Sequence, residues 1–148
     1  MSIETLVAIV FRWIHLGAAI VAVGGTVFQR FILMPALSAV GEAERTVIRE
    51  RVLARWRIVV HSSVLALLLS GIYNAFVAFP QHKGQPLYHS IFGVKALLAL
   101  GIFGIATVLT GKSDRAQRMR GRGPFWMGLL VALTAAVVAL SGVLKNLS

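Results

Sequence analysis

Cysteine is absent from the 148 residues of the chain. This absence excludes disulfide bonds, iron–sulfur clusters, thiol redox chemistry and covalently attached c-type haem, because each of them needs a cysteine sulfur. Methionine is scarce too, at four residues, so the soft sulfur ligands that favour Cu(I) are few. A copper site in this chain would therefore have to depend on histidine.

Acidic residues are also few. Five Asp and Glu stand against fifteen Lys and Arg, which gives a formal net charge of +10. The basic residues lie in two clusters between apolar segments, a pattern that predicts membrane orientation and not a nucleic-acid partner. A hydrophobic content of 57% and a mean hydropathy of +0.81 are far above those of an ordinary soluble domain. We expect one domain, a polytopic α-helical membrane protein.

Proline is sparse, and all four prolines lie at the boundaries of apolar segments. Since proline cannot continue a helical hydrogen-bond ladder, Pro35 and Pro80 are expected to end the first and second spans, and Pro124 suits the first turn of the fourth. Each segment is near the ~20 residues that cross a bilayer. The predicted spans are residues 5–34, 57–79, 88–110 and 124–145. The charged segment 42–56 is predicted to be an amphipathic helix that continues into the second span.

The loops between these spans differ in charge. The first and third carry eleven Lys and Arg between Arg30 and Arg122, counting those at span ends, whereas the second carries only Lys83. The positive-inside rule then predicts an all-α, antiparallel four-helix transmembrane bundle with both termini on the outer side. A prokaryotic inner membrane is the expected location, with anionic lipid headgroups against the basic loops. In the fourth span, small residues four apart, such as Ala132 and Ala136, favour close helix packing in lipid.

The first span has two different faces. At about 100° per residue, one side is polar or small and the other is bulky and apolar. The polar or small side holds Arg12, His15, Ala18, Ala19, Ala22, Thr26, Gln29 and Arg30. The bulky side holds Trp13, Ile20, Val27, Phe28 and Phe31. The first side suits a protein interior and the second suits lipid. An ionisable group inside a membrane usually faces a partner, a cavity or a ligand, so His15 is the first candidate for chemistry.

His15 has two interpretations. The alanines beside it, Ala18, Ala19 and Ala22, would leave room for a flat macrocycle, which favours a haem or metal ligand. Plain helix packing explains the same alanines, and His15 would then be satisfied by a neighbouring helix. Lys95 lies about 10 Å inside the third span at a ~1.5 Å rise per residue. It would pair with a substrate or a haem propionate, or else snorkel to the outer surface.

A haem held by two histidines needs both at similar depth on facing helices. His61, near the cytoplasmic start of the second span, differs in depth from His15 by roughly 10 Å. His89, at the mouth of the third span, differs by somewhat less, so His15 with His89 ranks first and His15 with His61 second. Arg30 is expected to be an interfacial anchor. The outer halves of the spans should bring together Arg12, His15, Tyr73, Asn74, His89 and Lys95.

Several short motifs resemble one family of membrane proteins. Arg12-Trp-Ile-His15-Leu and Phe28-Gln-Arg30 resemble the first helix of the copper-resistance D (CopD) family, and Phe92-Gly-Val-Lys95 resembles its third helix. The architecture is similar to that of HemJ-type protoporphyrinogen oxidases. The resemblance implies a four-helix membrane protein associated with haem b, in which His15, Arg30 and Lys95 match the first-helix histidine, the following arginine and the third-helix lysine. Where HemJ proteins have a further histidine, this chain reads Met34-Pro-Ala.

Three functions remain open at this point. The first is an integral membrane haem-b-binding protein of redox type with His15 as an axial ligand. An enzyme acting on a porphyrin, with Lys95 or Arg12 meeting carboxylates, is its sub-case. The second is copper transport or tolerance through His15 and His89, with His82 as an additional ligand. The third is a structural accessory subunit of a larger membrane complex, or a homo-oligomer, held through the small residues of the fourth span.

Overall fold

The computed structural model describes residues 2–146 and contains no strand in that range. In chain order the elements are α1 (Ile3–Phe28), the π-turn η1 (Gln29–Leu33), α2 (Met34–Leu37), α3 (Glu42–Ala78), the 3₁₀ turn η2 (Phe79–His82), α4 (Pro86–Thr110), α5 (Asp114–Gly121) and α6 (Gly123–Asn146). The prediction of an all-α chain is confirmed.

Four helical runs within residues 2–146 are long and apolar enough to cross a membrane. They are Ile3–Leu37, Glu42–His82, Pro86–Thr110 and Gly123–Asn146. Many of their large apolar side chains point outward: Trp13, Phe76 and Leu97 are 69%, 75% and 71% exposed. Such a surface is suited to lipid and not to water, which indicates an integral membrane protein.

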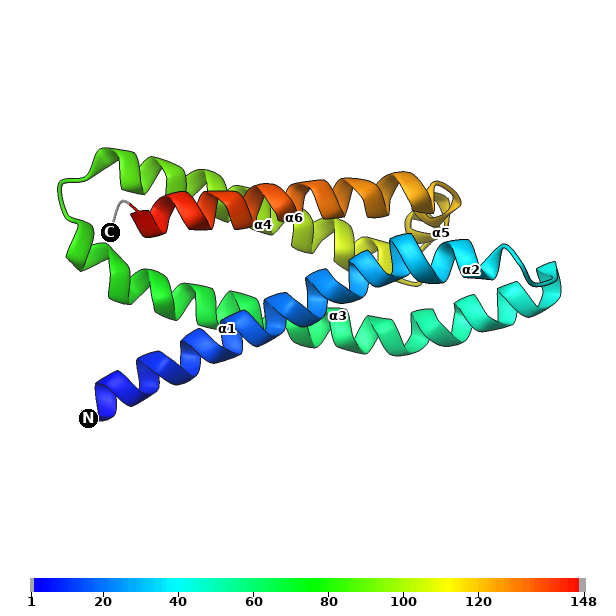
Figure 1. The fold of residues 1–148 in the computed structure, drawn as a ribbon, viewed down its shortest axis with the longest axis horizontal. Helices are drawn as coiled ribbons and strands as arrows, with labels where there is room; N and C mark the ends of the chain where they lie inside the picture. Colours follow the sequence, from blue (N-terminus) through cyan, green and yellow to red (C-terminus); the bar gives the residue numbers. More distant parts are fainter. Residues whose placement is uncertain (1, 147–148) are drawn as a thin grey trace.

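The helices pack as two antiparallel pairs, α1 with α3 and α4 with α6, and α3 also adjoins α4 (Figure 1). At one end of the bundle, the short helices α2 and α5 lie beside the turns between the long helices. At the other end, the N-terminal part of α1 diverges from the remaining helices (Figure 1). We call these the closed end and the open end.

Pro35 does not end the first helix, contrary to the expectation from sequence. The helical run continues to Leu37, and the backbone passes through the π-turn just before the proline. In that turn the N–H of Met34 donates to the carbonyl of Gln29, five residues back. Because a π-turn already interrupts the regular hydrogen-bond ladder, a residue without an N–H is tolerated immediately after it. Arg45 then ties this helix end to α3 by donating to the carbonyls of Leu37, Ser38 and Val40.

The second span agrees with its prediction at one end and differs at the other. The charged segment 42–56 and the apolar span form a single helix, Glu42–Ala78, as expected. Pro80 does not stop the helical run but lies inside the 3₁₀ turn that carries it to His82. The basic loop after α4 contains a helix that was not predicted, α5, whose first turn is capped by the Ser113 hydroxyl accepting from the Ala116 N–H.

The two faces of α1 are as predicted, with one exception. All five bulky residues of the lipid side are exposed. The residues of the interior side are half-buried, except for Arg12, which is exposed. The exception follows from the divergence of α1, because its first turns leave the bundle at the open end (Figure 1).

The small residues of the fourth span do not pack inside this chain. Helix α6 packs on α4, but through a face that includes the buried Leu130 and Leu144. Ala132, Ala136 and Ala139 are all exposed. The predicted device for close helix approach is therefore present on α6 but faces away from its neighbours in this chain.

Candidate functional site

The site begins with the antiparallel register of α1 and α3. Near the open end, the rings of Phe11 and Tyr73 stack with centroids 4.2 Å apart and an interplanar angle of 17°. Toward the closed end, Gly25 gives room to the Trp56 ring, which would collide with any Cβ placed at that glycine. His15 lies between these two contacts and reaches α3 at Ser70.

His15 is oriented by a buried hydroxyl. Its Nδ1 is 2.8 Å from Oγ of Ser70, a side chain with no exposed surface. The Ser70 hydroxyl donates its only proton to a backbone carbonyl of α3, that of Ala66 at 2.5 Å. In the arrangement in which this hydroxyl donates to Ala66, it accepts from Nδ1 of His15, and Nε2 of that neutral tautomer has a free lone pair. The ring lies against α3, with Cε1 3.7 Å from the position that a Cβ at Gly71 would take.

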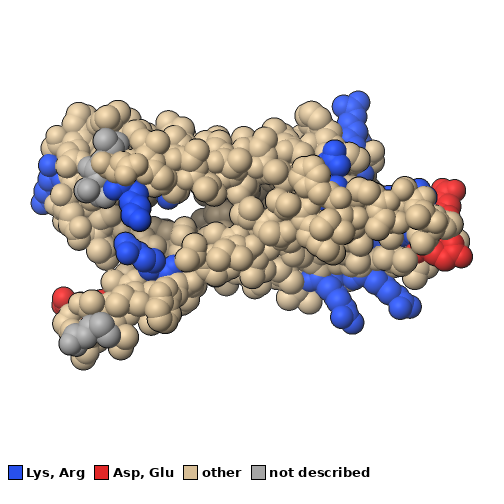
Figure 2. All heavy atoms as spheres, viewed as in Figure 1, with Lys and Arg blue, Asp and Glu red and all other residues tan. Residues whose placement is uncertain are grey.

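Lys95 of α4 is a cation close enough to His15 for its charge to act on the ring. It is half-buried, and its charge acts on His15 across the bundle. Within residues 2–146, Lys95 forms no hydrogen bond or ion pair. The space-filling view has an opening between the α1/α3 pair and the α4/α6 pair, with Lys and Arg atoms at its border (Figure 2). His15, Ser70 and Lys95 thus belong to three helices that meet in one half of the molecule.

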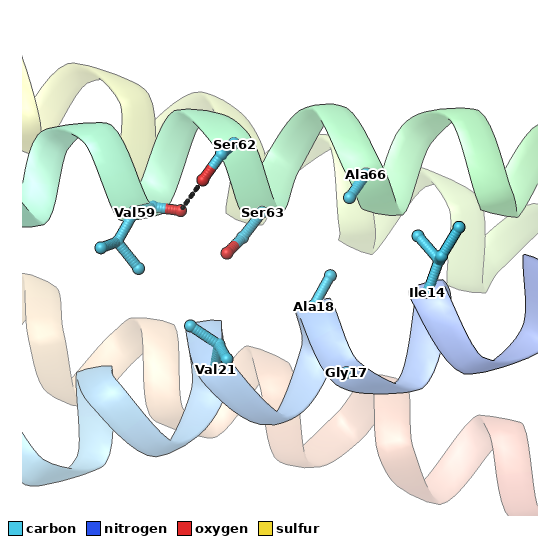
Figure 3. A pocket seen from close by; sticks show the side chains of 8 residues that line it. All are labelled: Ile14, Gly17, Ala18, Val21, Val59, Ser62, Ser63 and Ala66. Atoms are coloured by element: carbon cyan, nitrogen blue, oxygen red, sulfur yellow. Dashed lines mark hydrogen bonds between the residues drawn. The ribbon is translucent and has the colours of Figure 1, made fainter.

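An open groove runs beside this arrangement between α1 and α3 and has a volume of about 460 Å³ (Figure 3). It is lined by Ile14, Gly17, Ala18, Val21, Val59, Ser62, Ser63 and Ala66. Ser62 donates to the carbonyl of Val59 at 3.1 Å, whereas the Ser63 hydroxyl points toward α1 (Figure 3). The room that the sequence predicted beside His15 is present, but Ala18 alone of the three predicted alanines lines it.

The other histidines lie elsewhere. His61 is exposed and donates from Nδ1 to the carbonyl of Arg57 at 2.7 Å, nine residues and roughly 13 Å along α3 from Ser70. His89 is also exposed and sits edge-on to the ring of Phe79, with centroids 5.4 Å apart. Neither histidine faces His15. The structure therefore brings together neither of the two histidine pairs ranked from sequence.

His82 and the arginines complete the set of predicted residues. His82 is buried, stacked 3.8 Å from the Tyr88 ring and bonded through Nδ1 to a carbonyl of its own turn. Arg12 is exposed one turn before His15. Arg30 lies in η1, roughly 22 Å along the helix from His15, with its guanidinium 5.5 Å from the Phe31 ring centroid and its Nε buried without an acceptor in the described chain.

Sequence reasoning missed the part played by Ser70. In the sequence, Ser63, Ser70 and Asn74 form a polar stripe on the side of the second span opposite His61, and in the structure Ser63 and Ser70 are buried while His61 is exposed. That stripe was the available signal, but nothing in it pointed to His15. In the described part of the chain, no three His, Asp or Glu side chains lie close enough to hold a metal ion. One imidazole with a free nitrogen is what this site offers.

No family model, curated protein or solved structure matches the chain.

Proposed function

We propose that this chain is an integral membrane protein of redox type that binds haem b through Nε2 of His15. The observation that carries the proposal is the chain of hydrogen bonds from His15 Nδ1 to Ser70 and on to the Ala66 carbonyl. A histidine that ligates a metal usually donates its other ring N–H to an oxygen, which sets the tautomer and the ring orientation. His15 has that arrangement in an apolar part of the bundle.

The surrounding residues fit a haem as well. Haem carries carboxylates, and Lys95 is a half-buried cation that acts on His15 and has no partner in residues 2–146. Arg12 lies one turn farther toward the open end and would serve as a second cation. When bound, haem b supplies one-electron chemistry at its iron. The chain itself would hold the imidazole in one tautomer, place a positive charge nearby and exclude water with apolar helices.

The proposal predicts how many histidines bind. Since neither His61 nor His89 faces His15, the chain would supply one histidine ligand and not two. A haem with one histidine ligand keeps a coordination position open to added ligands, which a haem with two histidines does not. This point distinguishes the site from the paired-histidine arrangement expected from sequence.

An absorption spectrum of the purified protein tests the proposal. Full-length protein is produced with ample haem, purified in neutral detergent and scanned with and without reductant. Wild type should show a Soret band that shifts when carbon monoxide is added to the reduced protein. His15→Ala should lose the band, and Ser90→Ala, whose exposed hydroxyl bonds to its own helix outside the groove, should keep it. Wild-type protein without a Soret band would contradict the proposal.

The exposed small-residue face of α6 supports a second candidate, an accessory subunit that binds another membrane helix through Ala132, Ala136 and Ala139. Ala136→Leu should then abolish co-purification of partner chains, or of a second copy, while His15→Ala should leave it intact. If Ala136→Leu leaves co-purification unchanged, this candidate fails. Elemental analysis of the same preparations tests the copper alternative, and the haem proposal expects no bound copper in the wild type.

We also propose that both termini lie on the outer side of the membrane. The support is the excess of Lys and Arg at the closed end, where the turns after α2 and α4 lie. A tag fused after Ser148 should be reached by an impermeant reagent added outside intact cells. A tag that reacts only after the membrane is opened would contradict this orientation.

A further inference from the structure

Two arginines from different parts of the chain meet at the turn between α4 and α5. Arg57 of α3 donates from Nε to the carbonyl oxygen of Thr110 at 2.5 Å. Arg120 of α5 donates from Nη1 to the carbonyls of Leu109 at 2.9 Å and Gly111 at 2.8 Å. Carbonyls at the C-terminal end of a helix have no partner inside it. Both guanidinium groups are therefore fixed against the same turn of backbone.

The positive charge at this turn exceeds what the helix end offsets. A helix C-terminus carries roughly half a negative charge, so two guanidinium groups leave an excess of roughly one and a half positive charges. Burial, and after it the charge of Arg57, lowers the pKa of Arg120, so the two cations act on each other. Neither arginine has an acidic partner within residues 2–146. Two cations held together in this way favour an anion between or beside them.

Each guanidinium also keeps donors that the turn does not use. Arginine has five N–H groups in a planar fork. Only Nε of Arg57 and Nη1 of Arg120 are engaged, so the other nitrogens lack acceptors in the described chain. The turn after α2 shows what capping of a helix end requires by itself. There a single arginine, Arg45, donates from two nitrogens to three backbone carbonyls. The second arginine at the α4–α5 turn is more than capping requires.

The place of the turn in the fold points to the kind of anion. Thr110 is the last residue of an apolar helix long enough to cross a membrane, so the turn lies at the level of lipid headgroups. Lys and Arg side chains project from this end of the bundle (Figure 2). Arginine forks match the oxygens of a phosphate group, and basic pockets between membrane helices bind anionic headgroups. We propose that Arg57 and Arg120 bind the phosphate of an anionic phospholipid headgroup.

The test titrates full-length protein in neutral detergent with phosphatidylglycerol and follows the midpoint of thermal unfolding. Wild type should be stabilised in a saturable way, and phosphatidylcholine should have no such effect. Arg57→Gln and Arg120→Gln should each weaken the apparent affinity about tenfold or more. Arg115→Gln is the matched control, because it removes the same charge from an exposed position of α5. Its affinity should stay within about twofold of wild type.

Four results would overturn the proposal. An equal loss in Arg115→Gln would mean that total charge binds the lipid, and equal stabilisation by phosphatidylcholine would mean that the anion is irrelevant. Inorganic phosphate acting as strongly as phosphatidylglycerol would make free phosphate the ligand. Should either glutamine variant fail to fold, hydrogen exchange of wild type decides. Phosphatidylglycerol must then slow hydrogen exchange at the amides of residues 109–121 more than at those of residues 36–45. Equal protection of the two segments, or none, overturns the proposal.

Discussion

At the closed end of the bundle, Arg45, Arg57 and Arg120 tie helix ends together through backbone carbonyls. At the open end, where α1 diverges, His15 is held by a single buried hydroxyl and Lys95 has no partner in the described chain. The polar groups of the closed end include these three anchored guanidinium groups, of which Arg57 and Arg120 keep further donors. Those of the open end leave a ring nitrogen and an ammonium group free for a ligand. This difference is the physical reason for placing the proposed function at the open end.

The two ends also differ in how closely α1 approaches α3. At Gly25, nearer the closed end, an added Cβ would collide with the Trp56 ring. At Gly71, beside His15, an added Cβ would make an ordinary contact of 3.7 Å with Cε1. The contact near the closed end thus specifies glycine, whereas Gly71 beside His15 would accommodate a methyl group.

The largest effect is expected from Gly25→Ala. The new methyl group must displace the Trp56 ring, and overpacking of this kind costs about 1–3 kcal/mol. Gly71→Ala and Gly24→Ala should change the free energy of unfolding by less than about 1 kcal/mol, because the first makes an ordinary contact and the second meets open space. Equilibrium unfolding in mixed detergent measures all three variants. Equal stabilities for Gly25→Ala and Gly71→Ala would remove the contrast between the two ends.

Ser70→Ala should weaken haem binding without abolishing it. The variant keeps Nε2 of His15 but removes the oxygen that fixes the tautomer, and loss of such a supporting partner typically lowers affinity about 10- to 100-fold. Ser90→Ala is the matched control, since its exposed hydroxyl bonds to the carbonyl of Pro86 on the same helix and lies outside the groove. Titration of haem into the apoprotein, followed at the Soret band, gives both affinities. A Ser70→Ala affinity equal to that of Ser90→Ala would show that the Ser70 hydroxyl does not orient His15.

Helical periodicity was sufficient to predict the faces of α1. Lipid selects bulky apolar residues and a neighbouring helix selects small ones, and both selections repeat with the helical period. Arg12 departs from the pattern because the divergence of α1 is a tertiary feature that a helical wheel does not contain. Pro35 departs for a local reason, since the π-turn before it had no signal in the apolar pattern.

The partner of His15 lay beyond sequence reasoning. Ser70 is 55 residues away, and its meeting with His15 depends on the register of α1 against α3. Two other contacts between these helices occur in the same register, the stack of Phe11 on Tyr73 and the approach of Trp56 to Gly25. Both join residues that are far apart in the chain. The outward face of α6 has a similar cause. The spacing of Ala132 and Ala136 predicts close packing but not the helix that supplies the partner.

At the closed end, Arg45→Ala should destabilise the fold moderately. The side chain satisfies three carbonyls at the turn after α2, and a hydrogen bond from a charged group contributes about 1.5–3 kcal/mol at most. Because the turn is partly exposed, water replaces much of this hydrogen bonding in the variant. We expect the free energy of unfolding to fall by about 1 kcal/mol. Arg49→Ala, an exposed position on the same helix, should be nearly silent. The haem spectrum should be unchanged in both variants, since neither residue belongs to the open end.

The smallest effects are expected from His61→Ala and His89→Ala. His61 bonds to the carbonyl of Arg57 at the far end of α3, and His89 is exposed beside Phe79, so neither reaches His15. Both variants should keep the Soret band, its position and its response to carbon monoxide, in contrast to His15→Ala. The sensitive measurement is the spin state by electron paramagnetic resonance, because a lost second histidine would convert a low-spin signal to a high-spin one. A change from low spin to high spin in His89→Ala alone would mean that His89 and His15 both ligate the haem. That outcome would require α4 to move toward α1 when the cofactor binds.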